Sequence, residues 1–399
     1  MRGTRLLLSR AVWLVPKAAN VGGCVVVAGS RPLSSTSSTT AAASQMAAVV
    51  VNEHKHSNLP PMRNHPQHAE TATALVDGLL SYTRELMDAP RTKKTTSEDN
   101  NNDYMHIRHV VAFSGGIDSS LVLALLKQAS SDLNGGQEKE SVHAVIGRSS
   151  ALPQDQLDLA RRVSQHIGIP LVEVETTEGT DETYIANNGQ ACLACKTHLY
   201  SALQAVAEHA TATVSSNSTD HDYEDNPQSY NNDNEVLLYN GTNANDVQDT
   251  TRVGLLAARN FQVQSPLLYT TKENVRKAAQ HLGLPNWNVA ASPCLRSRLA
   301  LGVHATQEHL QRIEAAESFV RQELKNVLSI TSNLRVRLLA GNQAMLEVDT
   351  ELLPQVQAAV RGAVWQDHFI QTLTFASLRV RAFQSGSVSK KTNEEHSNV

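Results

Sequence analysis

HVVAFSGGIDSS, residues 109–120, carries the clearest structural signal in this chain of 399 residues. Its apolar first half predicts a buried strand, its two glycines predict a sharp turn, and the residues from Ser119 to about Gln128 predict a helix. Glycine tolerates positive φ and lets the backbone approach a ligand closely. The start of a helix presents free N–H groups and the positive end of the helix dipole to an anion. The stretch therefore predicts a phosphate-binding loop.

This loop differs from two common nucleotide-binding sequences. No lysine follows the glycines as in a Walker A loop, and the glycine spacing of a Rossmann dinucleotide site is absent. Ser114, Ser119 and Ser120 add hydroxyl donors. A chance Gly-Ser turn is the alternative, but the strand before it and the helix after it argue against that interpretation.

Strands and helices alternate along the chain around this loop. Predicted strands at 142–146, 171–174 and 236–239 and a helix at 156–166 join the strand at 109–113. This alternation predicts an α/β fold with a parallel sheet and helices on both faces. Helices predicted at 272–282 and 306–324 lead into a last segment. Its strands at 334–338, 344–348 and 372–380 and its helix at 352–361 predict a second, smaller α+β domain.

These patterns divide the chain into successive parts. We expect a transit peptide at 1–45, an amphipathic helix and polar linker within 46–106, the phosphate-loop domain at 107–300, the α+β domain at 301–388 and a tail at 389–399. A Ser-, Asn- and Asp-rich stretch at about 211–234 predicts a disordered surface insertion.

The first fifty or so residues have the composition of an organelle leader. They are rich in arginine, serine and threonine and contain no acidic residue before Glu53. Mitochondrial import is the favoured prediction, with a plastid or secretory route as the alternative. A disordered tail that carries no targeting signal has a similar composition and is a further alternative.

The overall composition argues against two classes of partner. The chain has 35 basic and 39 acidic side chains, a formal net charge of −4, and no apolar run long enough to cross a bilayer. Nucleic-acid enzymes are more often basic. We therefore expect neither a nucleic acid nor a membrane as partner.

A second polar loop follows the strand predicted at 236–239. It reads NGTNANDVQD, residues 240–249, and contains Asn243, Asp246 and Asp249. Oxygen ligands of this kind suit Mg²⁺, and the same groups could bind a ribose. A polar turn with Asx capping is the alternative.

Three cysteines lie outside the leader, which itself contains Cys24. Cys192 and Cys195 form a C-x-x-C motif, and Cys294 follows about a hundred residues later in ASPCLRSR. Arg296 and Arg298 would favour a thiolate there and could bind phosphate. Three chemistries remain open: a [4Fe–4S] cluster on three thiolates, a zinc site that recruits His198, and a redox dithiol with Cys294 as a separate nucleophile.

The motifs together resemble a known family. S-G-G-x-D-S is the signature of the PP-loop ATP pyrophosphatases. Its combination with C-x-x-C-K, N-x-x-D-x-x-D, S-P-C-x-x-S-R and a terminal S-G-S resembles the LarE family over about residues 70–388. The resemblance implies a PP-loop (HUP-like) domain and an ATP-dependent, AMP-forming sulfur transferase. Such an enzyme adenylates a carboxylate of a small nucleotide-like substrate and converts it to a thiocarboxylate.

The resemblance also implies roles for single residues. ATP would contact the loop residues and others of the two domains: Ser114, Gly115, Gly116, Asp118, Ser119, Ser120, Asn243, Asp246, Arg335 and Arg337. Catalytic roles fall on Cys294, Asp118, Arg298 and Glu317. Metal ligands would be Cys192, Cys195 and Cys294 for a [4Fe–4S] cluster, with Asp249 and Glu347 for Mg²⁺. A homo-oligomer and a sulfur donor protein are the implied partners.

The sequence differs from the LarE pattern at two places, and other functions remain as alternatives. Gln384 replaces the family's usual arginine before the terminal S-G-S, and residues 299–302 lack its usual Pro and Tyr. A tRNA-thiolating enzyme shares the PP-loop and often three cysteines. An amide-forming synthetase of the NAD or GMP type shares the loop without needing the cysteines, and a nucleotide-binding regulator would need no catalysis.

Overall fold

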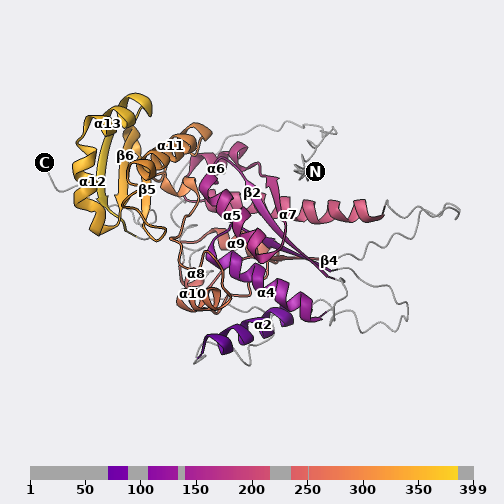
Figure 1. The fold of residues 1–399 in the computed structure, drawn as a ribbon. Helices are drawn as coiled ribbons and strands as arrows, with labels where there is room; N and C mark the ends of the chain where they lie inside the picture. Colours follow the sequence, from indigo (N-terminus) through magenta and orange to yellow (C-terminus); the bar gives the residue numbers. More distant parts are fainter. Residues whose placement is uncertain (1–70, 89–106, 134–139, 216–234, 250, 385–399) are drawn as a thin grey trace, which may run out of the picture.

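The computed structural model describes residues 71–88, 107–133, 140–215, 235–249 and 251–384 (Figure 1). The expected transit peptide, the polar linker and the C-terminal tail lie outside the described residues. The expected insertion also lies largely outside them. Its predicted start is wrong, however, because helix α7 (Ala191–Ser215) continues to Ser215.

The first domain is built on a four-stranded parallel sheet. The strands are β1 (Ile107–Ala112), β2 (Glu140–Arg148), β3 (Leu171–Glu175) and β4 (Glu235–Tyr239), in the order β3-β2-β1-β4. Val111 of β1 lies between Ala144 of β2 and Tyr239 of β4. The α/β prediction with a parallel sheet is confirmed.

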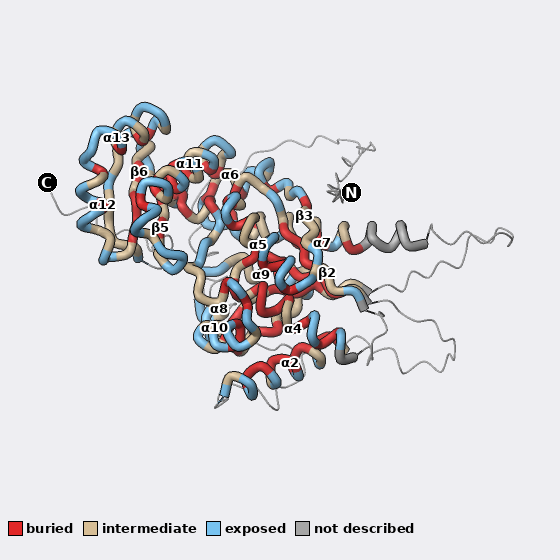
Figure 2. The backbone as a smooth tube through the Cα atoms, in the orientation of Figure 1, coloured by how far each residue is buried: buried red, intermediate tan, exposed pale blue. Residues whose placement is uncertain are grey.

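Helices cover both faces of this sheet because its central strands are apolar on both sides. Val111 belongs to the core beneath α2 (Ala72–Asp88), α4 (Ile117–Leu133), α5 (Gln154–Ile167) and α10 (Lys272–His281). Its neighbour Val110 points the other way, into the core beneath α7 and α9 (Gly254–Asn260). Figure 2 shows the resulting buried centre of the domain.

The second domain is a small mixed sheet covered by helices, as predicted. Strands β5 (Leu334–Leu339) and β6 (Gln343–Val348) are antiparallel, and β7 (Ser377–Ala382) pairs with β6 in parallel. Helices α11 (Gln307–Glu323) and α12 (Leu353–Val360) lie beside it. The strand predicted at 372–380 starts late, because Asp367–Thr372 form a last helical segment, η6, after α13 (Ala363–Gln366).

The two domains share a continuous core at their junction. Leu295 and Leu299, which follow the third cysteine, pack in the same apolar cluster as α11 and β5. Ala191 and Ala194 of the C-x-x-C segment belong to that cluster as well. The thiol-bearing segments are therefore anchored where the domains meet. Among the described helices, none combines the length and apolarity needed to span a bilayer.

Candidate functional site

The glycine loop makes a tight turn against α5. Gly115 has φ +69°, and a Cβ atom there would lie 2.6 Å from the Cα of Ala160. Glycine is therefore required both by the backbone conformation and by the close approach of α5. Gly116 is less constrained, since its added Cβ would meet only Ser114 Oγ at 3.3 Å.

Hydroxyl and amide groups hold the loop in this shape. The Ser119 and Ser120 hydroxyls donate to the Gly116 carbonyl at 3.1 and 2.9 Å. Asn286 Nδ2 donates to the Gly115 carbonyl at 2.8 Å and to Ser120 Oγ at 3.0 Å. Sequence reasoning missed Asn286, because it lies 171 residues from the loop that it supports. The first turn of α4 is thus fixed, and its first N–H groups have no partner within the helix.

The second polar loop lies against the same turn, because β1 and β4 are neighbours. Asn243 Nδ2 donates to Asp118 Oδ1 at 2.9 Å, and Lys272 Nζ lies 3.8 Å from Asp118 Oδ2. A Cβ added to Gly241 would lie 2.7 Å from the Ser119 nitrogen. The two motifs, far apart in sequence, therefore form one site at the carboxyl ends of parallel strands, the usual place for a ligand in this architecture.

Asp246 and Asp249 contact an arginine in this structure. Asn243 and Asp246 form a capping box at α8 (Ala244–Gln248). Arg252 Nη1 lies 2.8 Å from Asp246 Oδ1, and its Nε lies 3.5 Å from Asp249 Oδ2. Burial raises the pKa of Asp246, while a hydrogen bond from Thr251 lowers the pKa of Asp249. The Asx-capping interpretation thus describes the loop, and Mg²⁺ would have to compete with Arg252 for these carboxylates.

The three cysteines converge from two segments. Cys192 and Cys195 lie in the first turn of α7, and Cys294 precedes the short turn η3 (Leu295–Arg298). Arg296 Nη2 donates to Cys192 Sγ at 2.8 Å, so the segment after the third cysteine binds the first. Its Nη1 donates to Asn187 Oδ1 at 2.8 Å.

Burial and neighbouring charges shift the pKa values of two of the thiols. Desolvation raises the pKa of Cys192, and the Arg296 charge opposes that rise. Desolvation and then the nearby Cys294 raise the pKa of Cys195 to about 12. Cys195 packs against the same core cluster as Leu295, the residue after Cys294, so the two thiol-bearing segments meet in one region. No disulfide joins them.

The thiol region has the donors for an iron–sulfur cluster but is not arranged as a site for a single metal ion. Within the described ranges, no three His, Cys, Asp or Glu side chains are grouped to hold one ion. The predicted zinc ligand His198 instead binds Asp181 through Nε2 at 3.0 Å and Thr177 through Nδ1 at 2.9 Å. Three thiolates are the usual kind of ligand for an iron–sulfur cluster.

Arg298 and Glu317 form a buried ion pair. Arg298 is 1% exposed, and its Nε donates to Glu317 Oε1 at 3.0 Å. Its Nη1 donates to the carbonyls of Pro293 and Cys294. Glu317 Oε1 also accepts from the Val336 backbone at 3.0 Å. In this arrangement the pair ties the Cys294 segment to α11 and β5.

Arg335, Arg337 and Glu347 lie on one face of the small sheet. Glu347 is fully buried and pairs with Arg337 Nε at 2.7 Å and with Arg381 Nη2 at 2.6 Å. The Arg335 guanidinium lies over the Phe383 ring, 4.5 Å from its centroid. Burial, and then the charges of Arg298 and Arg337, lower the pKa of Arg335 to about 10.

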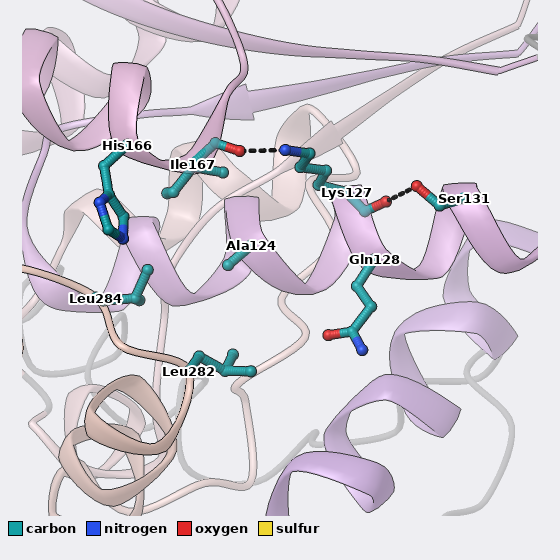
Figure 3. A pocket seen from close by; sticks show the side chains of 8 residues that line it. All are labelled: Ala124, Lys127, Gln128, Ser131, His166, Ile167, Leu282 and Leu284. Atoms are coloured by element: carbon teal, nitrogen blue, oxygen red, sulfur yellow. Dashed lines mark hydrogen bonds between the residues drawn. The ribbon is translucent and has the colours of Figure 1, made fainter.

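A surface cavity of about 360 Å³ lies elsewhere, along the later turns of α4 (Figure 3). Lys127 and His166 line it together with Leu282 and Leu284. The Lys127 ammonium donates to the Ile167 carbonyl and so caps the end of α5. This cavity contains none of the predicted site residues.

Comparison with known proteins agrees with this geometry. A family model described as "tRNA methyl transferase HUP domain" matches residues 107–293. "Uncharacterized protein slr1717" of Synechocystis sp. is 31% identical over 286 residues, which are 71% of this chain and 92% of that protein. "Pyridinium-3,5-bisthiocarboxylic acid mononucleotide synthase" of Lactiplantibacillus plantarum is 30% identical over 217 residues, 54% of this chain and 67% of that protein.

One solved structure is also similar in part. A glutamine-dependent NAD⁺ synthetase from Acinetobacter baumannii in complex with ADP aligns with a TM-score of 0.35 and 17% identity. The alignment covers 53% of this chain and 33% of the synthetase, which is too little to support a conclusion.

The parallel sheet, the glycine loop and its companion loop define a HUP-domain protein of the PP-loop ATP pyrophosphatase class. The chain belongs to the family of slr1717 and is a distant homologue of the pyridinium bisthiocarboxylic acid mononucleotide synthase, the LarE relationship that its motifs indicated.

Proposed function

We propose that the protein is an AMP-forming sulfur transferase that converts a carboxylate of a small nucleotide-like substrate into a thiocarboxylate. The observation that carries the proposal is the grouping of three thiols in one region while a PP-loop lies in the same domain. The name of the synthase relative, which describes a bisthiocarboxylic acid mononucleotide, supports the same chemistry.

The first step uses the loop. A substrate carboxylate oxygen attacks the α-phosphorus of ATP, a C–O–P linkage forms, and the bond to the β-phosphate oxygen breaks with release of pyrophosphate. The start of α4 would bind the leaving pyrophosphate through free N–H groups. Asp118, held by Asn243, would orient Mg²⁺ at this point, since Mg²⁺ prefers carboxylate oxygens.

The second step uses the thiol region. A sulfur nucleophile attacks the activated acyl carbon, and AMP departs with the former carboxylate oxygen. Adenylation is needed because a free carboxylate has no good leaving group. A [4Fe–4S] cluster held by Cys192, Cys195 and Cys294 would supply the sulfur-carrying chemistry. Arg296 and Arg298 would keep the segments that bear these thiols in place.

A chain of contacts between the two regions supports one reaction that uses both of them. Asn243 binds Asp118, and its capping partner Asp246 binds Arg252. Two residues further on, a Cβ added to Gly254 would lie 3.4 Å from the Cys192 carbonyl oxygen. The segment after the second polar loop therefore packs against the helix that carries Cys192. In the proposed reaction, sulfur held by the thiols would meet an adenylate formed at the PP-loop.

Anaerobic assays of the full-length chain test the proposal. We expect ATP- and carboxylate-dependent pyrophosphate release, which should fall by roughly 100-fold in Asp118→Asn if this carboxylate holds the Mg²⁺ that stabilises the transferring phosphate. Asp155→Asn, which changes an exposed residue of α5, is the matched control. Cys294→Ala should retain pyrophosphate release and lose thiocarboxylate. Purified protein without iron, sulfide or any sulfur transfer would contradict the proposal.

A second candidate is thiolation of tRNA, because the matching family model is described as a tRNA methyl transferase HUP domain. The formal net charge of −4 argues against it. Salt-sensitive retention of tRNA, with transfer of sulfur to it, would favour this candidate over the small substrate.

The proposal extends to location and partners. The leader composition supports mitochondrial import, which imaging of a full-length fusion would test against a plastid location. A homo-oligomer and a sulfur donor protein fit the proposed chemistry, whereas neither a membrane nor a nucleic acid is required. Light scattering and cross-linking during turnover would test both partners.

A further inference from the structure

Glu178 is a buried carboxylate beside the thiols. It begins the short turn η2 (Glu178–Thr180) and is 2% exposed. Cys195 Sγ donates to its Oε1 at 3.9 Å. Its Oε2 is buried and has no hydrogen-bond partner among the described residues.

Such a carboxylate is unfavourable without a partner. Burial of a charge away from water requires a counter-charge or several hydrogen bonds. The thiol of Cys195 is a weak donor and supplies neither. Buried polar atoms without partners commonly mark the place of an ion or ligand. The unpartnered oxygen of Glu178 therefore indicates that the thiol region binds an ion or a ligand.

Tyr184 gives a second, independent observation at the same place. Its side chain is 1% exposed, and its hydroxyl has no hydrogen-bond partner among the residues described. Tyr184 belongs to the core cluster that contains Leu295, the residue after Cys294, and against which Cys195 packs. Burial and then the charges of Cys294, Cys195 and Glu178 raise its pKa. Two buried oxygens without partners among the described residues therefore lie on segments that pack with the cysteine-bearing segments.

We propose that Glu178 is the fourth protein ligand of the metal centre held by Cys192, Cys195 and Cys294. The inference rests on the proposed function. Three cysteines leave one position of a four-iron cluster without a protein ligand, and a carboxylate oxygen is a competent iron ligand. A carboxylate binds such a position more weakly than a thiolate, so Glu178 can yield it to incoming sulfur. Tyr184 is placed to donate a hydrogen bond nearby.

The test uses the full-length chain reconstituted without oxygen from ferrous iron and sulfide. Glu178→Gln keeps the shape and removes the charge, Glu178→Ala removes the side chain, and Glu182→Gln is the control on an exposed neighbour. We expect Mössbauer spectra of the parent protein to contain one iron site distinct from the rest, which hydrosulfide alters. This distinct site should be lost in both Glu178 variants.

Iron release to a chelator gives a second readout. We expect both Glu178 variants to release iron about tenfold or more faster than the parent, and Glu182→Gln to match the parent. Thermal unfolding followed by circular dichroism establishes that each variant is folded. If Glu178→Gln does not fold, the spectra and iron release of Glu178→Ala decide, because three cysteine ligands alone would also give the parent protein one iron that hydrosulfide alters.

The outcomes separate the two proposals. Sulfur transfer by a parent protein whose iron sites all resist hydrosulfide, or Glu178 variants with unchanged spectra and iron release, would overturn the assignment of Glu178 alone. A parent protein that takes up no cluster would overturn this assignment and the cluster part of the proposed function together.

Discussion

Arg296 binds Cys192 through a hydrogen bond of 2.8 Å from its Nη2 to the sulfur. The two residues are separated by 104 positions in the chain. This contact joins the C-x-x-C segment to the segment of the third cysteine. It also places the permanent positive charge of the Arg296 guanidinium beside the Cys192 thiol. The grouping of the cysteines thus depends on an arginine as well as on the fold.

Replacement of Arg296 should make Cys192 harder to ionise. Desolvation already raises the pKa of this thiol and Arg296 counters the rise, so Arg296→Gln should raise it further. In the metal-free protein, the pH profile of Cys192 alkylation should move upward by roughly one pH unit. Mass spectrometry of the modified peptide measures the shift. Arg162→Gln, an exposed change on α5, should leave the profile in place.

Cys195 should stay unreactive at neutral pH. Its pKa of about 12 means that its alkylation rate in the metal-free, folded chain should rise about tenfold per pH unit from pH 7 to about pH 10 without levelling. In urea the same rate should level off above about pH 8.5. The Cys195 thiol has a higher pKa in the folded chain than in the unfolded chain, so above about pH 8.5 the unfolded chain ionises more readily. The contribution of Cys195 to the free energy of unfolding should therefore fall as pH rises above about 8.5. A plateau near pH 8.5 in the folded chain would contradict the assigned environment.

Gly115→Ala should damage the loop far more than Gly116→Ala. The added methyl at Gly115 would lie 2.6 Å from the backbone of Ala160, in a backbone conformation with φ +69°. We expect a loss of about 1–3 kcal/mol in the free energy of unfolding, measured in urea, together with weaker ATP binding by calorimetry. Gly116→Ala meets only a movable hydroxyl at 3.3 Å and is the matched control. Equal effects of the two changes would contradict this description.

Glu317→Gln should destabilise the chain strongly. It leaves the Arg298 guanidinium, 1% exposed, without its carboxylate. Breaking a buried pair costs about 3–5 kcal/mol, which urea unfolding should detect. Adding Arg298→Met to Glu317→Gln should recover part of the loss, because no buried charge then remains. Lys277→Ala removes an exposed pair with Glu273 and should leave the midpoint unchanged.

Local patterns predicted most of the first domain. Strand β1, the glycine turn and α4 follow one another within a few residues, and their signals are alternation, glycine and apolar spacing. Helix α7 was not predicted, although it carries Cys192 and Cys195. It is buried against the sheet along much of its length, so its apolar residues do not form a single stripe.

The sequence predicted the residues of the candidate site less completely than it predicted the fold. Motifs pointed to Asp118, Asn243 and the cysteines because their spacing is local. Three further residues of the site lie outside those motifs: Asn286, Arg252 and Glu178. The role of each becomes visible only from the residue that it contacts in the folded chain. For Glu178 the only local signal was an acidic residue after a strand, which is a common surface feature.

The amino-acid order alone determined the phosphate loop, the parallel sheet and the presence of three thiols, because backbone preferences and hydrophobic periodicity act over a few residues. Tertiary structure alone decided that Arg298 faces Glu317 and that Arg296 reaches Cys192. It also decided that one buried oxygen of Glu178 has no hydrogen-bond partner among the described residues. These relationships depend on how helices and sheets pack across long separations in the chain, and no local pattern encodes that packing.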